Sequence, residues 1–314
     1  MQRYLIRRLI NMVPVLLGLT LAVFLIMRVI PGDVAALMLE ESPTAQRKDE
    51  LRRQLGIDRP MHEQYLGWVG NALRGDFGTS FWTNRSVLGE IRRTAPVTLE
   101  LALLASGIAL MLALPIGILS AVKQDTLWDY LGRSLSITAL SIPTFWLGTL
   151  AVVLPAIWFK WVPPVTYRPL WEDPWTNLRQ FWLPAIVVGA SASAAMMRMT
   201  RSALLEVLRQ DYIRTAQAKG MRSGTVILRH ALKNALIPVV TLFGALVGGL
   251  LAGTVITETI FNLPGFGSLT IDAISQRDYP QIQANVLLFG VIYTAINLAV
   301  DLSYGLFNPR IRYE

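Results

Sequence analysis

Cysteine is absent from this sequence of 314 residues, and histidine occurs only as the widely separated His62 and His230. Disulfides and thiolate sites are therefore excluded, and a metal site built from histidines is not expected. Charged residues are also scarce, at 16% against about 25% in soluble globular domains. Hydrophobic residues make up 53% of the chain, and its mean hydropathy is +0.44. This balance indicates a membrane protein.

The sequence also lacks the patterns expected of a catalytic or ATP-binding chain. It contains no G-x-x-x-x-G-K-[ST] run, and none of its five lysines follows a glycine. The backbone-and-lysine cradle that holds ATP phosphates is therefore missing. No Ser-His-Asp, Cys-His or paired-carboxylate arrangement stands out. We expect neither enzymatic activity nor a bound cofactor.

Long apolar runs are abundant instead. A helix needs about 20 apolar residues to cross the hydrocarbon layer. The stretches that qualify are about 9–30, 98–122, 134–158, 183–200, 236–259 and 284–306. The first run is too long for the core of a signal peptide, so we interpret it as an uncleaved anchor. The prediction is an all-α membrane protein with six transmembrane helices.

Lysine and arginine predict the orientation of these spans. The N-terminal tail, the 123–133 and 198–235 loops and the C-terminal tail hold fifteen of them, against four in the 159–182 and 260–283 loops. Positive charge marks the cytoplasmic side, so both termini are predicted to be cytoplasmic. The net charge of +8 is thus a topology signal, and we expect no nucleic-acid partner. Anionic lipid is the expected contact of these basic residues.

The 31–97 segment is the longest stretch without an apolar span, and long loops cross a membrane largely regardless of charge. We place it outside. PGD at 31–33 and DRP at 58–60 predict breaks, and LRRQLG and MHEQYLGWVGNAL on either side of DRP predict short helices. The predicted organisation is a tail and first span at 1–30, an external insertion at 31–97, and a core at 98–314 that includes a cytoplasmic loop at 201–235.

The stretch DYIRTAQAKG at 211–220 lies inside this cytoplasmic loop. Leu204, Leu208, Tyr212 and Ala216 recur every four residues, which predicts an apolar stripe on one helix face. Gly220 permits a turn. Beyond the turn, apolar residues at 228, 231, 232 and 235 predict a second amphipathic helix, with Arg222, Arg229 and Lys233 on another face. Spacing alone leaves two interpretations open: a helix that lies on anionic headgroups, or one that docks on a cytoplasmic partner.

The loop resembles the EAA loop of permease subunits of ABC importers, and the whole chain resembles the peptide-transporter branch of that family. The matching segments run in order along the chain: RYLIRRL at 3–9, PGD at 31–33, LGIDRPMHEQYL at 55–66, GDFGTS at 75–80, TLELALL at 98–104, RMTRSALLEVLRQDYIRTAQAKG at 198–220, LPGFG at 263–267, RDYP at 277–280 and NPRIR at 308–312. Two departures stand out. Arg214, Thr215 and Ala216 occupy the Glu-Ala-Ala positions, and Leu236-Ile237-Pro238 lies farther from Gly220 than in the general pattern.

The resemblance implies a type I ABC importer-like permease fold in the bacterial or archaeal cytoplasmic membrane. It implies that this chain forms half of a translocation path with a second, homologous permease. Two cytoplasmic ATPases would power transport, and an external solute-binding protein would deliver substrate. Di- or oligopeptides are the expected substrates, with glutathione or nickel and other metal chelates as the alternative. The residues expected to couple to the ATPase are Asp211, Tyr212, Arg214, Thr215, Ala216, Ala218, Lys219 and Gly220.

Several polar and small residues have both a transport and a packing interpretation. Tyr293, Asn297 and Asp301 form one polar stripe on the last span, which lines a path or bonds a neighbouring helix. Ser191 and Ser193 face substrate or bond their own backbone, and Ser141 begins a SIPTF run whose proline kinks for packing or acts as a hinge. Pro264, Gly265 and Gly267 form an external gate or a plain turn. Gly244 with Gly248, and Gly249 with Gly253, allow close helix packing.

Two other functional classes remain open. An ion-coupled carrier needs ionisable groups near the bilayer midplane. The intramembrane acids Glu100, Glu258 and Asp301 all fall near predicted span ends, which suits structure better than a proton relay. A membrane scaffold without transport is the third possibility.

Overall fold

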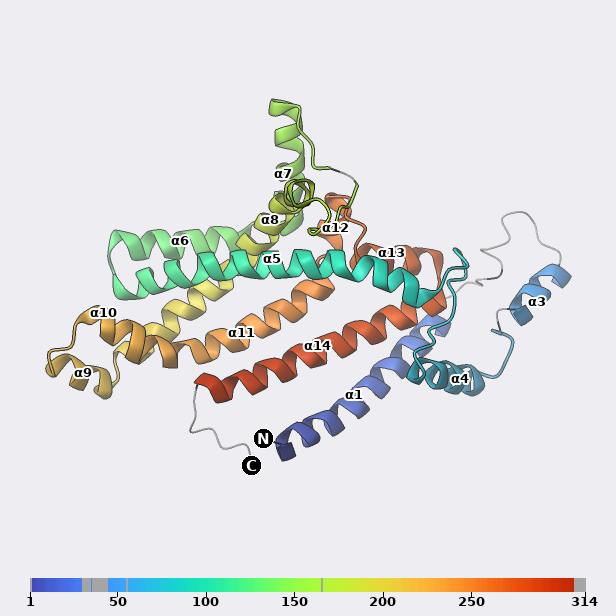
Figure 1. Ribbon diagram of the computed structural model, residues 1–314, viewed down its shortest axis with the longest axis horizontal. Coiled ribbons are helices and arrows are strands. Elements are labelled where there is room, and N and C mark those ends of the chain that lie inside the picture. Colours follow the sequence, from blue (N-terminus) through green and yellow to red (C-terminus); the bar gives the residue numbers. More distant parts are fainter. Residues whose placement is uncertain (1, 30–34, 36–44, 55, 165, 308–314) are drawn as a thin grey trace. The chain divides into compact units, whose positions relative to one another are not determined.

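The computed structural model describes residues 2–29, 35, 45–54, 56–164 and 166–307, so the predicted break at 31–33 and the NPRIR segment lie outside the described residues. The regular elements of the described chain are all helices (Figure 1). They group into two compact units. The first comprises Met1–Val97 and Pro264–Thr294, and the second comprises Thr98–Leu263 and Ala295–Glu314. Two helices, α5 (Val87–Val122) and α14 (Tyr279–Phe307), contribute to both.

The first unit contains the first predicted span and the predicted short helices. Helix α1 covers Gln2–Val29, and Pro14 lies within it. Helices α3 (Ala45–Gln54) and α4 (Met61–Leu73) lie on either side of the DRP break, as the sequence predicts. Pro60 precedes the first residue of α4, because proline suits a helix start and not a helix interior. Helix α13 (Phe266–Gln276) and the first part of α14 complete this unit.

Apolar packing in the first unit joins segments from both ends of the chain. Val23 and Met27 of α1 pack with Ala273, Tyr279 and Ile282. A second cluster joins the start of α5 to α13 and α14 through Val87, Ile91, Phe266 and Ala284. These side chains give the unit a core of its own. Burial of each large apolar side chain contributes roughly 1.5–3 kcal/mol to the free energy of folding.

One buried carboxylate connects the 76–86 segment to the turn between α13 and α14. Asp278 is 3% exposed, and the Ser80 hydroxyl donates to its Oδ2 at 2.5 Å while the Phe81 N–H donates to its Oδ1 at 3.2 Å. The Trp82 indole N–H donates to the Gln276 carbonyl at 2.6 Å beside it. Burial raises the pKa of Asp278, whereas the hydrogen bonds from Ser80 and Phe81 act to lower it. Two loops 198 residues apart are thereby joined.

We expect Asp278→Ala to lower the free energy of unfolding by about 2 kcal/mol, because the buried Ser80 hydroxyl and the partly buried Phe81 N–H lose their acceptor. Asp278→Asn keeps an acceptor and should retain near wild-type stability at neutral pH. The folded pKa lies above the unfolded value, so ionisation of Asp278 costs stability as pH rises through that window. The stability of wild type relative to Asn should therefore improve as pH falls. Unfolding curves in detergent at several pH values measure this, and equal loss in both variants would contradict it.

The second unit holds the remaining spans. It contains α5 from Thr98 onward and the end of α14. The helices wholly within it are α6 (Leu127–Ser141), α7 (Thr144–Phe159), α8 (Pro174–Leu208), α9 (Asp211–Ala218), α10 (Ser223–Thr225), the π-helix η1 (Val226–Ala231), α11 (Leu232–Gly253) and α12 (Val255–Ile260). Among described residues, five helices are long and apolar enough to cross a membrane, or six if the bent pair α6 and α7 counts as one span. The six-span prediction is confirmed in this sense.

Two spans differ from their predicted form. The third is not one straight helix over 134–158, because α6 and α7 meet at 90°. Pro143 forces the preceding Ile142 into an extended conformation, which ends α6. The fourth span is much longer than 183–200. Its 35 residues reach about 52 Å, so α8 continues well beyond the roughly 30 Å hydrocarbon layer.

Glycines allow α5 and α8 to approach closely. A Cβ atom on Gly189 would lie 2.7 Å from the Ala105 carbonyl oxygen, and one on Gly117 would lie 2.8 Å from the Thr200 Cβ. In α11, Gly244 is buried against Val300 of α14, whereas Gly249 is exposed with nothing within 4 Å of its missing Cβ. Of the two overlapping glycine patterns predicted in this span, the one that starts at Gly244 therefore packs within the chain.

We expect Gly189→Ala to destabilise the protein by about 1–3 kcal/mol, because the added methyl group meets a backbone oxygen that cannot rotate away. The matched variant Gly249→Ala adds the same group into open space and should leave the melting temperature unchanged or slightly raised. Thermal unfolding of the two purified variants tests the difference. Equal melting temperatures would show that α5 and α8 do not pack this closely.

Candidate functional site

The cytoplasmic loop predicted from the sequence contains three short helical elements between α8 and α11. Helix α9 begins at Asp211 and ends at Ala218, so the predicted helix is confirmed. Gly220 adopts φ +74°, a left-handed conformation that glycine takes without strain. The chain then forms α10 and η1 and enters α11. The predicted turn at Gly220 is confirmed as well.

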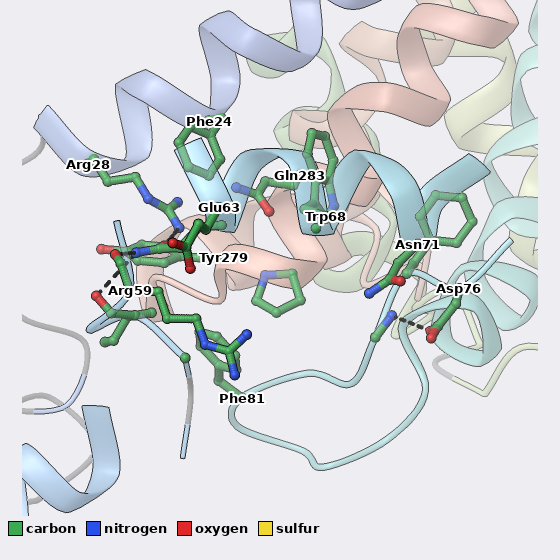
Figure 2. A pocket seen from close by; sticks show the side chains of 17 residues that line it. Phe24, Arg28, Arg59, Glu63, Trp68, Asn71, Asp76, Phe81, Tyr279 and Gln283 are labelled. Carbon is green, nitrogen blue, oxygen red and sulfur yellow. Dashed lines mark hydrogen bonds between the residues drawn. The ribbon is translucent and has the colours of Figure 1, made fainter. Parts of the chain in front are cut away.

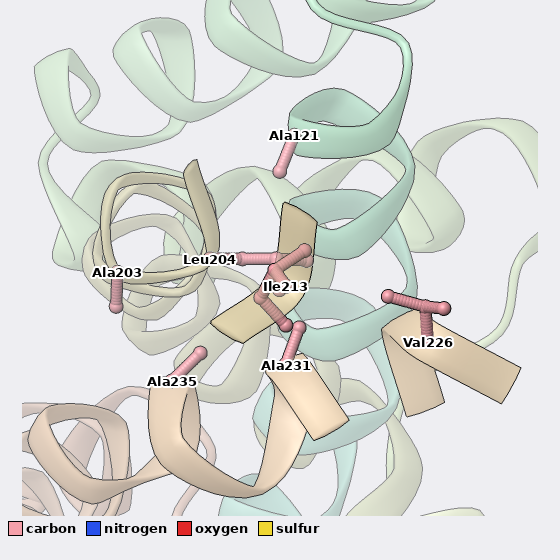
Figure 3. Packing of buried hydrophobic residues seen from close by; sticks show 7 residues of the cluster. All are labelled: Ala121, Ala203, Leu204, Ile213, Val226, Ala231 and Ala235. Atoms are coloured by element: carbon pink, nitrogen blue, oxygen red, sulfur yellow. The ribbon is translucent and has the colours of Figure 1, made fainter. Parts of the chain in front are cut away.

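Ile213 is the one fully buried residue through which α9 packs on the rest of the second unit. Its side chain lies in a cluster with Leu204 of α8, Val226 and Ala231 of η1, Ala235 of α11 and Ala121 of α5 (Figure 3). Every other described residue of α9 is at least partly exposed. The helix is therefore held from one side only, and the opposite side presents its residues to solvent.

The predicted apolar stripe is wrong at Tyr212. Helix α8 ends at Leu208, and the chain turns before α9 begins, so a four-residue period does not continue from one helix into the other. Tyr212 is 43% exposed, and its hydroxyl accepts a hydrogen bond of 2.8 Å from Asn234 Nδ2. Ile213 takes the buried position instead. The sequence pattern missed it because the break between the helices shifts the buried face by one residue.

The eight residues predicted to couple to a partner lie mainly on the exposed side of this loop. All of them except the half-buried Ala216 are exposed. The Arg214 guanidinium lies 3.5 Å from the Asp211 carboxylate, and the Thr215 hydroxyl donates to the Asp211 carbonyl at 2.9 Å. Small side chains at 215, 216 and 218 leave the helix surface shallow. Another protein surface can therefore approach its backbone closely.

After the short α10, the second half of the loop continues as a π-helix and not as a regular α-helix. In a π-helix such as η1, backbone hydrogen bonds join residues five apart, whereas an α-helix joins residues four apart. This difference shifts the face on which each side chain lies. Leu228 is consequently 65% exposed, and its predicted place on the apolar face is wrong, whereas Ala231 and Ala235 are buried as expected. Arg222, Arg229 and Lys233 are exposed. Single π-helical turns within α-helices are frequent at functional positions.

A buried ion pair that the sequence patterns did not indicate stabilises the base of this loop. Arg201 of α8 donates from Nε to Asp129 Oδ1 at 2.7 Å and from Nη2 to Oδ2 at 2.6 Å. Asp129 is fully buried, and it also accepts from the Ser120 hydroxyl at 2.5 Å and the Asp125 N–H at 3.0 Å. Four donors thus satisfy one carboxylate. The only available signal was an isolated acid in the apolar run LWDYL.

Glu258 is a second buried acid whose hydrogen bonds come from its own segment and from α5. It is fully buried at the end of the α11–α12 segment, and its Oε1 accepts from the Thr98 hydroxyl at 2.6 Å and the Thr254 hydroxyl at 3.0 Å. Glu100 accepts from the Tyr167 hydroxyl at 3.3 Å. The hydrogen bonds of Glu258 agree with the structural role that the sequence suggested for this acid.

The remaining predicted residues fall in separate places. Ser141 is exposed and donates to the Ile137 carbonyl of its own helix, and the buried Ser193 donates to Ala190. Ser191 shares a 3.1 Å hydrogen bond with Thr144 of α7. On α14, Tyr293 is exposed and Asn297 and Asp301 are half-buried. Pro264 is half-buried, and Gly265 and Gly267 are buried where α13 begins. The hydrogen bonds favour the packing interpretation for the serines.

Comparison with known proteins assigns the family. Residues 113–313 match the family described as "Binding-protein-dependent transport system inner membrane component". Residues 1–102 match the family that describes the N-terminal part of such components. The chain belongs to this family. The permease is thus a multi-pass inner-membrane subunit, and ATP hydrolysis and substrate capture belong to its partner proteins. The identification as an ABC importer permease from sequence motifs is confirmed.

The permease is similar to relatives over its full length. It is 42% identical to the di/tripeptide transport system permease protein DppB of Pseudomonas aeruginosa (strain UCBPP-PA14), with all of both chains covered. It is 40% identical to the glutathione transport system permease protein GsiC of Salmonella typhimurium (strain LT2), and 38% to that of Escherichia coli (strain K12), again with full coverage.

Solved structures support the fold. An inward-facing structure of the MetNI methionine ABC transporter matches with a TM-score of 0.56 at 16% identity, over 70% of the permease and 96% of that chain. A structure of an amino acid ABC transporter matches with a TM-score of 0.52 at 15% identity, over 71% and 95%. The predicted permease fold is confirmed. At such low identity the likeness extends to the fold alone.

We expect Asp129→Ala to cost about 3–5 kcal/mol of unfolding free energy, because it leaves the Arg201 charge partly buried without its partner. Arg201→Met in the Asp129→Ala background should restore part of the loss. Asp211→Ala is the matched control, since the Asp211–Arg214 pair is exposed on both sides and should contribute less than about 1 kcal/mol. A double-mutant cycle by chemical unfolding measures the coupling, and additive losses would contradict it.

Proposed function

We propose that this permease forms half of the translocation path of an ATP-driven importer of di- and oligopeptides. The observation that carries the substrate class is the 42% identity to a di/tripeptide permease over the whole of both chains. The glutathione permeases at 38–40% identity make glutathione the principal alternative. Metal-chelate uptake is a further alternative. Described residues contain no group of three metal-ligating side chains, but a chelated cargo does not require one.

We infer that α9 is the element through which the ATPases move the permease. The geometry of α9 supports this inference. One side of α9 is held by Ile213 in a cluster that includes residues of α5, α8 and α11, and the other side is exposed and shallow. A force applied to the exposed side is therefore transmitted to three long helices. A second, homologous permease would complete the path as a heterodimer, with one ATPase on each loop.

The proposed topology places both termini and the 201–235 loop in the cytoplasm and the 31–97 insertion outside. Three hydrogen-bonded contacts are consistent with it. Asp278–Ser80 joins two loops that were both predicted to be external, and Asp129–Arg201 joins two that were both predicted to be cytoplasmic. Tyr167, in a predicted external loop, bonds Glu100 at the predicted outer end of its span. We also propose that the chain is organised as a tail and first span at 1–30, an external insertion at 31–97 and a core at 98–314.

Within the path, we propose that the polar stripe of α14, Tyr293, Asn297 and Asp301, contributes lining. The exposure of Tyr293 and the partial exposure of the other two support this assignment. We propose that the Pro264–Gly267 turn at the start of α13 contributes an external gate. Ser141, Ser191 and Ser193 bond to neighbouring protein groups, so we assign them to packing and leave them out of the proposed path.

We expect Gly220→Pro and Ala216→Glu to uncouple ATP hydrolysis from uptake while the transporter still assembles. Proline fixes φ near −65°, which is incompatible with φ +74° at this turn, and the glutamate adds a charge to the half-buried edge of α9. The matched control is Gly224→Ala, because that glycine has ordinary φ and open space around it. Reconstituted vesicles that report ATPase rate and dialanine uptake test this. Wild-type coupling in both variants would refute the role of the loop.

A direct test of the partner uses the absence of cysteine. Ala218→Cys introduces a unique thiol on the exposed side of α9. A crosslink from this residue to an ATPase subunit supports the proposal. Uptake by the permease without ATPases, abolished by an ionophore and insensitive to ATP depletion, would support the ion-coupled carrier instead. Competition between dialanine and glutathione during uptake distinguishes the two substrates.

A further inference from the structure

A cavity in the first unit has features that packing does not explain. It measures about 310 Å³ and lies among α1, α4, the 76–81 segment and the start of α14 (Figure 2). Five aromatic residues contribute to its walls: Phe24, Trp68, Phe77, Phe81 and Tyr279. The volume is at the lower end of the range for small-molecule sites, about 300–1,000 Å³.

Three buried N–H groups in the wall of this cavity have no hydrogen-bond partner in the described part of the chain. They are Arg28 Nη1 of α1, Trp68 Nε1 of α4 and Gln283 Nε2 of α14. Gln283 is 4% exposed. Buried polar atoms are nearly always paired, and each unpaired one costs about 1–3 kcal/mol. Three different helices therefore supply donors to one cavity, and the complementary ligand is an acceptor with several lone pairs.

The arginine is held in a fixed position. Arg28 Nη2 donates to Gln64 Oε1 at 2.5 Å, and the guanidinium carbon lies 4.0 Å from the Phe24 ring centre and 5.1 Å from that of Tyr279. Gln64 is itself fixed, since its Nε2 donates to the Arg59 carbonyl at 2.7 Å. These contacts use one edge of the guanidinium and leave Nη1 free. A positive group with a free N–H selects an anion over a neutral acceptor.

The distribution of charge in the cavity indicates a ligand with two ends. Asp76 lies at the opposite end of the view from Arg28 (Figure 2). Between them, α4 lines the cavity with Gln64, Gly67, Trp68 and Asn71, a stretch of about 10 Å along the helix. Glu63 and Asp76 are both exposed to solvent, which weakens the charge of each, and Asp76 Oδ1 also accepts from the Gly78 N–H at 2.9 Å. Arg59 adds a second positive charge to the wall. An anionic group at the Arg28 end and a cationic group at the Asp76 end fit this arrangement.

We propose that this cavity binds a short zwitterionic peptide, with its terminal carboxylate on Arg28, Trp68 and Gln283 and its ammonium group toward Asp76. The peptide as ligand rests on the proposed function, whereas the oxyanion site rests on the three donors alone. The permease would thus hold its substrate on its own first unit, in addition to the binding protein. The other source of an oxyanion at a membrane surface is a lipid phosphate. Asp76 and the aromatic walls favour the peptide.

The test uses the full permease with its ATPase and permease partners in nanodiscs of neutral lipid, without the binding protein. Calorimetry compares dialanine with dialanine amide, which lacks the carboxylate. We expect the amide to bind about tenfold or more weakly, since a hydrogen bond to a charged group corresponds to at least a tenfold change in Kd. Trp68→Phe removes one N–H but keeps a ring, and Gln283→Leu removes another. Each should weaken dialanine about tenfold and leave the amide unchanged.

The matched control is Trp171→Phe, which makes the same change at an exposed position of the second unit and should leave both affinities unchanged. Equal affinity for dialanine and its amide would overturn the proposal, and so would wild-type affinity in Trp68→Phe. Binding of glycerol 3-phosphate in place of dialanine would assign the donors to a lipid phosphate and overturn it as well.

Uptake measurements separate failure of this site from failure of the proposed function. If the complete transporter imports dialanine and Trp68→Phe keeps the wild-type KM, the cavity is not a substrate site but the permease still transports peptides. If the complete wild-type transporter does not import dialanine or longer peptides, the proposed substrate class is wrong. An increased KM in Trp68→Phe at an unchanged ATPase rate is the outcome that we expect.

Discussion

Pairing of buried polar groups is the constraint on which this structure depends. In an apolar chain that crosses a membrane, neither lipid nor core can satisfy an isolated carboxylate. Asp129, Glu258 and Asp278 are each buried, and each accepts hydrogen bonds from a segment distant in the sequence. Apolar side chains can slide against one another with small cost, but these bonds fix which residues meet. They therefore specify the arrangement within each unit more narrowly than hydrophobic packing does.

The same constraint explains how a small exposed helix can transmit movement. Arg201 and Asp129 join α8 to α6 and to the end of α5, at the base of the loop that carries α9. Ile213 then attaches α9 to that base through a compact apolar cluster. The exposed side of α9 carries little that stabilises the fold, so its residues are free to serve a partner. Stability and the proposed contact with an ATPase are thus assigned to opposite sides of this eight-residue helix.

Unpaired groups have the opposite meaning. Within the described residues, Asp129, Glu258 and Asp278 have found partners, whereas Arg28 Nη1, Trp68 Nε1 and Gln283 Nε2 have not. Other buried polar atoms also have no partner there, on Glu100 and Gln180 among others, but these three belong to residues that line one cavity. Their grouping indicates a ligand, because its oxygens would complete the hydrogen bonding that the protein leaves open.

Composition and periodicity were sufficient to predict the membrane class, the approximate spans, the helix at 211–218 and the turn at Gly220, since these depend on local chain properties. Resemblance of ordered motifs was sufficient to identify the family. The 90° break before Pro143, the length of α8 and the burial of Ile213 in place of Tyr212 required the tertiary structure. So did the partners of Asp129 and Asp278 and the cavity at Arg28. Hydropathy records how apolar a segment is, but which distant residues meet depends on the paths of the helices, and those paths are decided only when the chain packs.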